Sequence, residues 1–464
     1  MKSLKYAVLA LALAVSTPAL AELSPEVERA MTLIDSGKAD DAVVLLEGLV
    51  RRNPNDVDAL TLLSSIYGEA KDMDRALSYA EAAVRSGPAD AGALIARAIA
   101  YNGVGQTDRA LADYATVLGA GPNPVAYFNR GLIYSRTNDD ERALADFKRA
   151  AELDPGVPDY SVRLALTLVS MGRTEEALAP YTEALKREPG NLYGLMGKTL
   201  ALMGLERWED AIAHSRAALK FHPKEVFFNE AIGRSLLVIG DVDAAFKVFN
   251  TMTRQSPAAS GGWEGRATIL ASRGDVKGAM ASYDRAIALD PTAAHLFVER
   301  GDLRLLAEDP VGALADFDAA LKIEPNRVDA LNSRGRYFLD VDAPQKALAD
   351  FDAAAAIDAD NVEVAGNRAL ALMKLGRHEA ALKEADRAIK ISPEAFGYGV
   401  KAAIHADMGD HRLAVSALDE AIRLDADDPL AWWGRGEAKA KLGDAAGAAA
   451  DKAQARKLDP RIAD

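Results

Sequence analysis

The chain has 464 residues, a formal net charge of −14 and no cysteine. The acidic balance argues against a nucleic-acid backbone or an anionic membrane surface as the main partner. The lack of cysteine leaves no residue for disulfide bonds, thiol catalysis or lipid attachment to a thiol.

Residues 1–21 have the features of a secretory leader. These features are a basic start, an apolar run of nine residues and a small-x-small cleavage motif, at Lys2 and Lys5, Ala7–Val15 and Ala19–Ala21 respectively. Nine apolar residues are too few to span a bilayer. We therefore expect cleavage before Glu22 and export to a Gram-negative periplasm, with full secretion as the alternative.

From residue 23 onward, one pattern of 34 residues recurs along the chain. In its clearest copy, Ala126–Pro155, two amphipathic segments are expected to be helices joined by a polar turn, Ala126–Arg136 and Asp140–Leu153. All intervals between copies are 34 residues except two of 33. The copies close at Pro54, Pro88, Pro122, Pro155, Pro189, Pro223, Pro257, Pro291, Pro325, Ala359, Pro393, Ala426 and Pro460.

Two positions of the pattern are always small. We call the last residue of each copy its closure. An alanine stands twelve residues before each closure, and a second small residue (Gly, Ala, Ser or Thr) stands twenty-four residues before it. Small side chains let two helices cross closely, and so short a helix pair can hide its apolar face only by stacking on similar pairs. The thirteen alanines are Ala42, Ala76, Ala110, Ala143, Ala177, Ala211, Ala245, Ala279, Ala313, Ala347, Ala381, Ala414 and Ala448.

This period, with its small and aromatic positions, resembles the tetratricopeptide repeat family over Leu23–Pro460. The resemblance implies an all-α fold, a right-handed α-solenoid of about 13 helix-turn-helix repeats whose first helices line a concave face. It also implies binding of peptides, partner proteins or further copies of the chain. The expected organisation is a signal peptide at 1–21, the solenoid over 22–460 and a short tail at 461–464.

Charged residues also recur at fixed positions. Eight repeats carry an arginine twenty-five residues before the closure, and six of these also carry an acid nine residues before it. Because the two charges occur together, we expect ion pairs between the two helices of one repeat. The expected pairs are Arg97–Asp113, Arg130–Asp146, Arg300–Asp316, Arg334–Asp350, Arg368–Glu384 and Arg435–Asp451.

The first helices of repeats three to seven carry a second apolar stripe. The segment Leu192–Met203 is apolar all round, and such a helix in a water-exposed protein is expected to be covered. One interpretation is a partner-binding groove, and the alternative is packing against neighbouring repeats only. In repeats eight to ten the same stripe turns acidic. The groove residues are Ile95, Ile99, Phe128, Asn129, Leu132, Val162, Arg163, Leu166, Val169, Tyr193, Met196, Leu200, Met203 and Phe227.

Near-matches to catalytic motifs lack essential residues. Gly197–Thr199 ends like a phosphate-binding loop, but Leu192 occupies the place of its first glycine. His378 and Glu379 begin a zinc-protease pattern, but Leu382 replaces the second histidine. The six histidines show no ligand spacing. We therefore expect a non-enzyme with no catalytic residues, no cofactor and no metal site.

The sequence favours an exported scaffold that binds a peptide or partner protein in the concave groove. No nucleic-acid partner and no membrane span after leader cleavage are expected. Two alternatives stay open, namely a carrier or sensor for a small apolar or glycan ligand, and a self-assembling structural component of the envelope.

Overall fold

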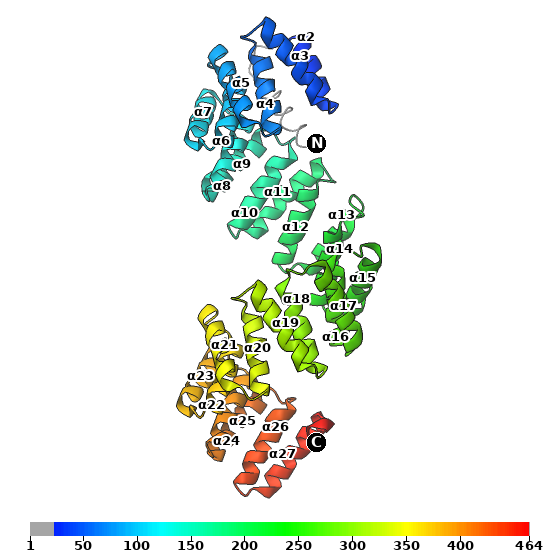
Figure 1. Ribbon diagram of the computed structural model, residues 1–464, viewed down its shortest axis with the longest axis vertical. Coiled ribbons are helices and arrows are strands. Elements are labelled where there is room, and N and C mark those ends of the chain that lie inside the picture. The colour runs from blue at the N-terminus through cyan, green and yellow to red at the C-terminus, as the bar shows by residue number, and fades with distance from the viewer. Residues whose placement is uncertain (1–22, 464) are drawn as a thin grey trace. The chain divides into compact units, whose positions relative to one another are not determined.

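The computed structural model describes residues 23–463, and the expected leader lies outside these residues. The described chain contains 26 α-helices and one terminal 3-10 helix, and no strand. Contacts between residues divide it into two compact units. Unit 1 ends at Asp241, and unit 2 begins at Val242. Within each unit, consecutive helical hairpins are stacked side by side (Figure 1). This confirms the expected all-α repeat solenoid.

Thirteen repeats are present, each with an even-numbered first helix and an odd-numbered second helix. Unit 1 contains α2 (Pro25–Asp35), α3 (Ala39–Arg52), α4 (Val57–Glu69), α5 (Met73–Ser86), α6 (Ala91–Gly103), α7 (Thr107–Ala120), α8 (Pro124–Arg136), α9 (Asp140–Leu153), α10 (Pro158–Ser170), α11 (Thr174–Arg187), α12 (Leu192–Gly204), α13 (Trp208–Ala218) and α14 (Val226–Val238).

Unit 2 begins with the second helix of the seventh repeat. It contains α15 (Val242–Gln255), α16 (Ser260–Ser272), α17 (Val276–Leu289), α18 (Ala294–Leu306), α19 (Pro310–Ile323), α20 (Val328–Asp340), α21 (Pro344–Ile357), α22 (Val362–Lys374), α23 (His378–Ile391), α24 (Ala395–Asp407), α25 (His411–Leu424), α26 (Pro429–Lys441), α27 (Ala445–Leu458) and η1 (Pro460–Ala463).

Local sequence signals explain where these helices begin and end. The Asn123 side chain accepts a hydrogen bond from the Ala126 N–H, and Pro124 follows in the first turn, so α8 begins two residues before the expected start. The second helix of this repeat, α9, has the expected bounds. Each turn between paired helices has one residue with positive φ, seventeen residues before the closure. Eight of these thirteen residues are glycines, which adopt this conformation without strain.

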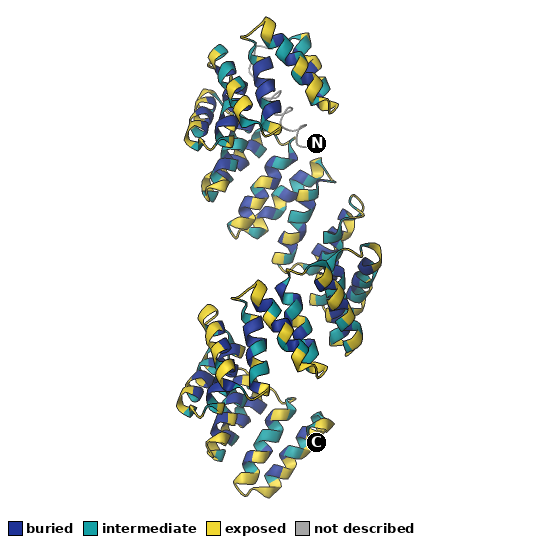
Figure 2. Cartoon of the chain, in the orientation of Figure 1, coloured by how far each residue is buried: buried dark blue, intermediate teal, exposed yellow. Residues whose placement is uncertain are grey.

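The two small positions lie where the helices of a repeat cross. All thirteen alanines are buried, and the most exposed of them, Ala448, has 6 % of its surface accessible. The second small position is buried in all thirteen repeats (Figure 2 shows buried residues in dark blue). A Cβ atom added to Gly335 would lie 2.5 Å from the ring of Phe351, so the glycine permits this approach. The expected role of the small residues is confirmed.

First helices also contact the first helices of neighbouring repeats, for example α4 with α6, α10 with α12 and α22 with α24. Second helices of consecutive repeats make no contact of similar extent among the described residues. The first helices are therefore closer together than the second helices. They line the inner side of each unit, as the resemblance implies.

All six expected ion pairs between paired helices are present. The Arg334 guanidinium donates two hydrogen bonds of 2.8 Å to the Asp350 carboxylate, and Arg97 binds Asp113 in the same two-pronged way. The acidic partners are buried. Because these acids are buried, loss of the arginine would leave a carboxylate without a partner away from water, which costs more than breaking an exposed ion pair.

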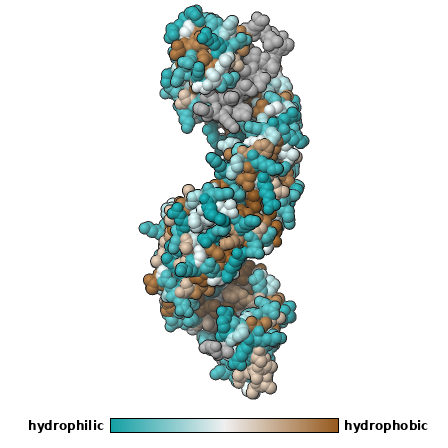
Figure 3. Space-filling model, turned by 90° about the vertical axis from the view of Figure 1, so that its right-hand side faces the viewer, coloured by the Kyte–Doolittle hydropathy of each residue, from teal (hydrophilic) through white to brown (hydrophobic). Residues whose placement is uncertain are grey.

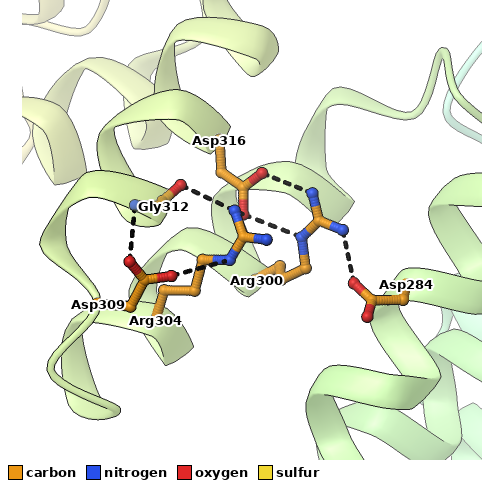
Figure 4. A network of polar contacts seen from close by, with 6 residues as sticks. All are labelled: Asp284, Arg300, Arg304, Asp309, Gly312 and Asp316. Atoms are coloured by element: carbon orange, nitrogen blue, oxygen red, sulfur yellow. Dashed lines mark hydrogen bonds and ion pairs between the residues drawn. The ribbon is translucent and has the colours of Figure 1, made fainter.

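Four arginines of unit 2 bind a second acid, on the second helix of the preceding repeat. Figure 4 shows Arg300 between Asp316 of its own repeat and Asp284 of the repeat before. Lys401 stands at the arginine position of repeat twelve, and it binds only the acid of the preceding repeat, Asp386, at 2.7 Å. These contacts form a ladder across every repeat interface from repeat eight to repeat thirteen: Arg300–Asp284, Arg334–Asp318, Arg368–Asp352, Lys401–Asp386 and Arg435–Asp419.

Arg334 provides a test of the two kinds of contact. We expect Arg334→Met to lower the free energy of unfolding of unit 2 by about 1–3 kcal/mol, because the buried Asp350 loses its hydrogen-bond donor. Asp318→Asn removes only the exposed contact and should cost about 0.2–1 kcal/mol. Urea unfolding followed by circular dichroism measures both. Equal losses in the two variants would contradict this ranking.

Candidate functional site

Apolar side chains reach the surface along the first helices of unit 1. One large apolar residue lies at the same position, twenty-three residues before the closure, in four consecutive repeats: Ile99, Leu132, Leu166 and Leu200. Together with Val169, Tyr193, Met196 and Met203 they form what we call the apolar strip. Figure 3 shows one face of the molecule, where apolar patches in brown interrupt a mainly hydrophilic surface.

Several strip residues have large exposed surfaces. Tyr193 is 74 % exposed, Leu200 is 55 % exposed and Leu166 is 41 % exposed. Leu132, Met196 and Met203 are half-buried. Because apolar side chains at one repeated position reach the surface in successive repeats, the strip is a candidate contact surface for an apolar partner.

Two predicted groove residues are not on the surface. Ile95 is completely buried and Val162 is 4 % exposed, and each belongs to a hydrophobic core cluster. Both stand twenty-seven residues before the closure, on first helices that contact neighbouring first helices. Phe128, at the same position, lies 4.9 Å from the ring of Tyr160 in the next repeat. The groove prediction is therefore wrong for Ile95 and Val162.

The remaining predicted residues lie on α8, α10 and α14. The Asn129 side chain donates a hydrogen bond to the Val125 carbonyl and is therefore engaged with its own helix. Arg163 is exposed on α10. Phe227 is half-buried against the ring of Phe228, at a centroid distance of 5.3 Å. Their part in binding stays a prediction.

Unit 2 has a polar hollow of about 540 Å³ on its first helices α18, α20 and α22. Buried amides and a hydroxyl connect these helices. The Asn367 amide donates to the Asn332 side-chain oxygen at 3.0 Å, and the Ser333 hydroxyl donates to Asp302 at 3.1 Å. The stripe that the sequence predicted to be acidic is thus partly enclosed and hydrogen-bonded.

The carboxylates of this hollow repel one another when they are charged. Burial raises the pKa of Asp302, and the negative charges of Asp329 and Glu363 act in the same direction, opposed by Ser333 and Arg336. Burial also raises the pKa of Glu299, with Asp302 acting in the same direction. These acids already form hydrogen bonds within the protein. The hollow is polar, whereas the strip is apolar.

Within residues 23–463, no group of three or more His, Asp or Glu side chains is arranged to hold a metal ion. No helix in this part of the chain is long and apolar enough to cross a membrane.

A family model described as tetratricopeptide repeat matches six segments that together cover well over half of the chain: 27–91, 95–158, 162–226, 230–294, 334–396 and 401–461. No curated protein matches the sequence.

Several solved repeat structures resemble the chain. The crystal structure of the Cut9–Hcn1 hetero-tetramer of APC/C has 16 % sequence identity and a TM-score of 0.49, with 90 % of this chain and 96 % of that chain covered. Yeast Tom70 has 16 % identity and a TM-score of 0.41, with 80 % and 92 % covered. A tetratricopeptide repeat protein from Parabacteroides merdae has 19 % identity and a TM-score of 0.45, with 50 % and 91 % covered. These likenesses assign no function to the chain.

Proposed function

The chain belongs to the tetratricopeptide repeat family, whose members are in general non-enzymatic scaffolds for protein–protein interaction, and we propose that it is an exported scaffold that binds one apolar segment of a partner protein. The proposed binding surface is the apolar strip on the concave side of unit 1. The observation that carries the proposal is a leucine or isoleucine at one position in four successive repeats, exposed as Ile99, Leu166 and Leu200 and half-buried as Leu132.

The chemistry of the strip favours an apolar segment over a charged one. The strip offers aliphatic, aromatic and thioether side chains, and methionines adapt to partners of different shape. Covering several half-exposed side chains of this size contributes on the order of a few kcal/mol. Ordering of the bound segment offsets part of that gain. A partner whose apolar side chains are spaced to meet successive repeats would use the whole strip.

Export is the second part of the proposal, and it rests on residues 1–21 of the sequence. A basic start, a short apolar run and a small-x-small motif are together typical of a cleaved secretory leader. The compartment we propose is the periplasm, where the partner segment would also be found.

A charge placed in the strip tests the binding surface. We expect Leu166→Glu to reduce capture of the partner at least tenfold, because the partner's apolar segment would have to desolvate a carboxylate. The measurement is quantitative pull-down from periplasmic extract with a photo-crosslinking residue at Tyr193. Mass spectrometry of the cross-linked peptide should identify an apolar segment.

Val44→Glu is the matched control, since Val44 is 68 % exposed and lies on the second helix α3 of the same unit. This variant should capture the partner within about twofold of the unmodified protein, and both variants should keep the helical circular dichroism spectrum. Equal capture by Leu166→Glu and the unmodified protein, or cross-links to a highly charged segment, would refute the proposed surface.

The leader is tested separately by expression of the full chain in a Gram-negative host. N-terminal sequencing of the periplasmic protein should begin at Glu22, and replacement of both Ala19 and Ala21 by leucine should prevent cleavage. An intact chain that begins at Met1 and remains in the cytoplasmic fraction would contradict export.

A further inference from the structure

A second hollow, of about 850 Å³, lies on unit 1 between α9, α10, α11 and α12. Its lining residues on the first helices include Leu164 and Lys198, each two residues before a leucine of the apolar strip. Side chains two residues apart on an α-helix point in directions that differ by roughly 200° around the helix axis. The hollow therefore lies on the side of these helices that faces away from the strip, and it is a separate surface.

The hollow occurs where the recurrent ion pair is missing. In repeats five and six, Leu164 and Lys198 stand at the arginine position, and Pro180 and His214 stand at the acid position. In repeats with the pair, the long arginine side chain and the buried acid occupy this seam between the helices. Leu164 and Pro180 are shorter and carry no charge, and both line the hollow.

Lys198 lies where a ladder arginine would lie, but it has neither of the ladder's carboxylates. Sixteen residues before it is Thr182 and sixteen after it is His214, where Arg300 has Asp284 and Asp316. The Lys198 ammonium instead donates a hydrogen bond to the Thr182 hydroxyl at 3.0 Å. Burial lowers the pKa of Lys198, the positive charge of Arg207 lowers it further, and the negative charge of Asp210 acts in the opposite direction. The ammonium is thus a partly buried charge without a neutralising partner at either position.

The acids around the hollow are engaged elsewhere. Glu183 pairs with Lys186 at 3.0 Å, and Glu152 pairs with Arg149 at 3.1 Å. Arg207 pairs with Asp210 at 2.7 Å and reaches Glu175 at 3.5 Å. These pairs leave the ammonium groups of Lys198 and the exposed Lys148 beside an apolar lining formed by Leu164, Leu178, Pro180 and Leu202.

We propose that this hollow binds a small organic anion, in which a carboxylate contacts the ammonium of Lys198 and a hydrocarbon part lies on Leu164, Leu178 and Leu202. The volume is that of a small-molecule site. The bound carboxylate supplies the charge that an aspartate supplies to the arginines of unit 2, and charge-assisted hydrogen bonds are the stronger kind. This site is independent of the apolar strip and of the protein partner proposed there.

Octanoate is a suitable probe, with 1-octanol of the same chain length as the uncharged comparison. Isothermal titration calorimetry on the protein from Glu22 onward should give at least tenfold tighter binding of octanoate than of octanol. Thr182→Asp should weaken octanoate at least tenfold, since it places a carboxylate next to the Lys198 ammonium and mimics the ladder contact. The matched control Thr182→Asn has a similar shape and no charge, and it should bind within about twofold of the unmodified protein.

Lys198→Met gives a second, independent variant, which removes the charge and keeps the apolar stem. It should bind octanoate and octanol about equally. Equal affinity for octanoate and octanol in the unmodified protein, or unchanged octanoate affinity in both Thr182→Asp and Lys198→Met, would overturn the proposal. Circular dichroism establishes that each variant is folded as the unmodified protein is, so a lost signal reports on the site.

Discussion

The distance between two packed helices depends on the side chains at their crossing, and a close crossing requires small ones. In each repeat of this chain, the second helix has an alanine at the crossing and the first helix has a small residue there. All of these residues are buried. Large side chains such as Phe147, Phe317 and Phe351 then fill the space beside the crossing, where they are fully buried. Because one hairpin cannot cover its own apolar surface, stacking follows from this contact, and stacking in turn positions every surface that a ligand could reach.

Departures from the repeat pattern distinguish the surfaces of the two units. In unit 2, an arginine or a lysine connects each of repeats nine to thirteen to the repeat before it, and a polar network links the first helices α18, α20 and α22. In unit 1 the first helices expose the apolar strip at other positions, and the loss of the ion pair in repeats five and six leaves the hollow beside Lys198. The repeat explains stability, whereas the site proposed beside Lys198 lies where two repeats lack a residue that their neighbours have.

Much of the fold could be predicted because a period of 34 residues tests each inference thirteen times. The helix bounds of α9, the burial of the alanines and the six ion pairs within repeats all follow from sequence spacing. Ile95 and Val162 were misplaced because helical spacing alone does not give the rotation of a first helix against the next first helix, which buries that position. The contacts of Arg300 and Arg334 with the preceding repeat had a signal, an acid seven residues before the earlier closure, but it becomes meaningful only once the distance between repeats is known. The hollow was not expected, since it depends on what Pro180 and Leu164 fail to fill.

The most direct test of the crossing as the basis of this fold is one substitution made on two faces of α21. Ala347 lies at the crossing with no accessible surface, and Ala353 on the same helix is exposed. Thermal unfolding of Ala347→Leu should show a loss of about 1–3 kcal/mol, because the added side chain forces the two helices apart. Ala353→Leu should change the stability by less than about 0.5 kcal/mol. Equal stability of the two variants would contradict the account.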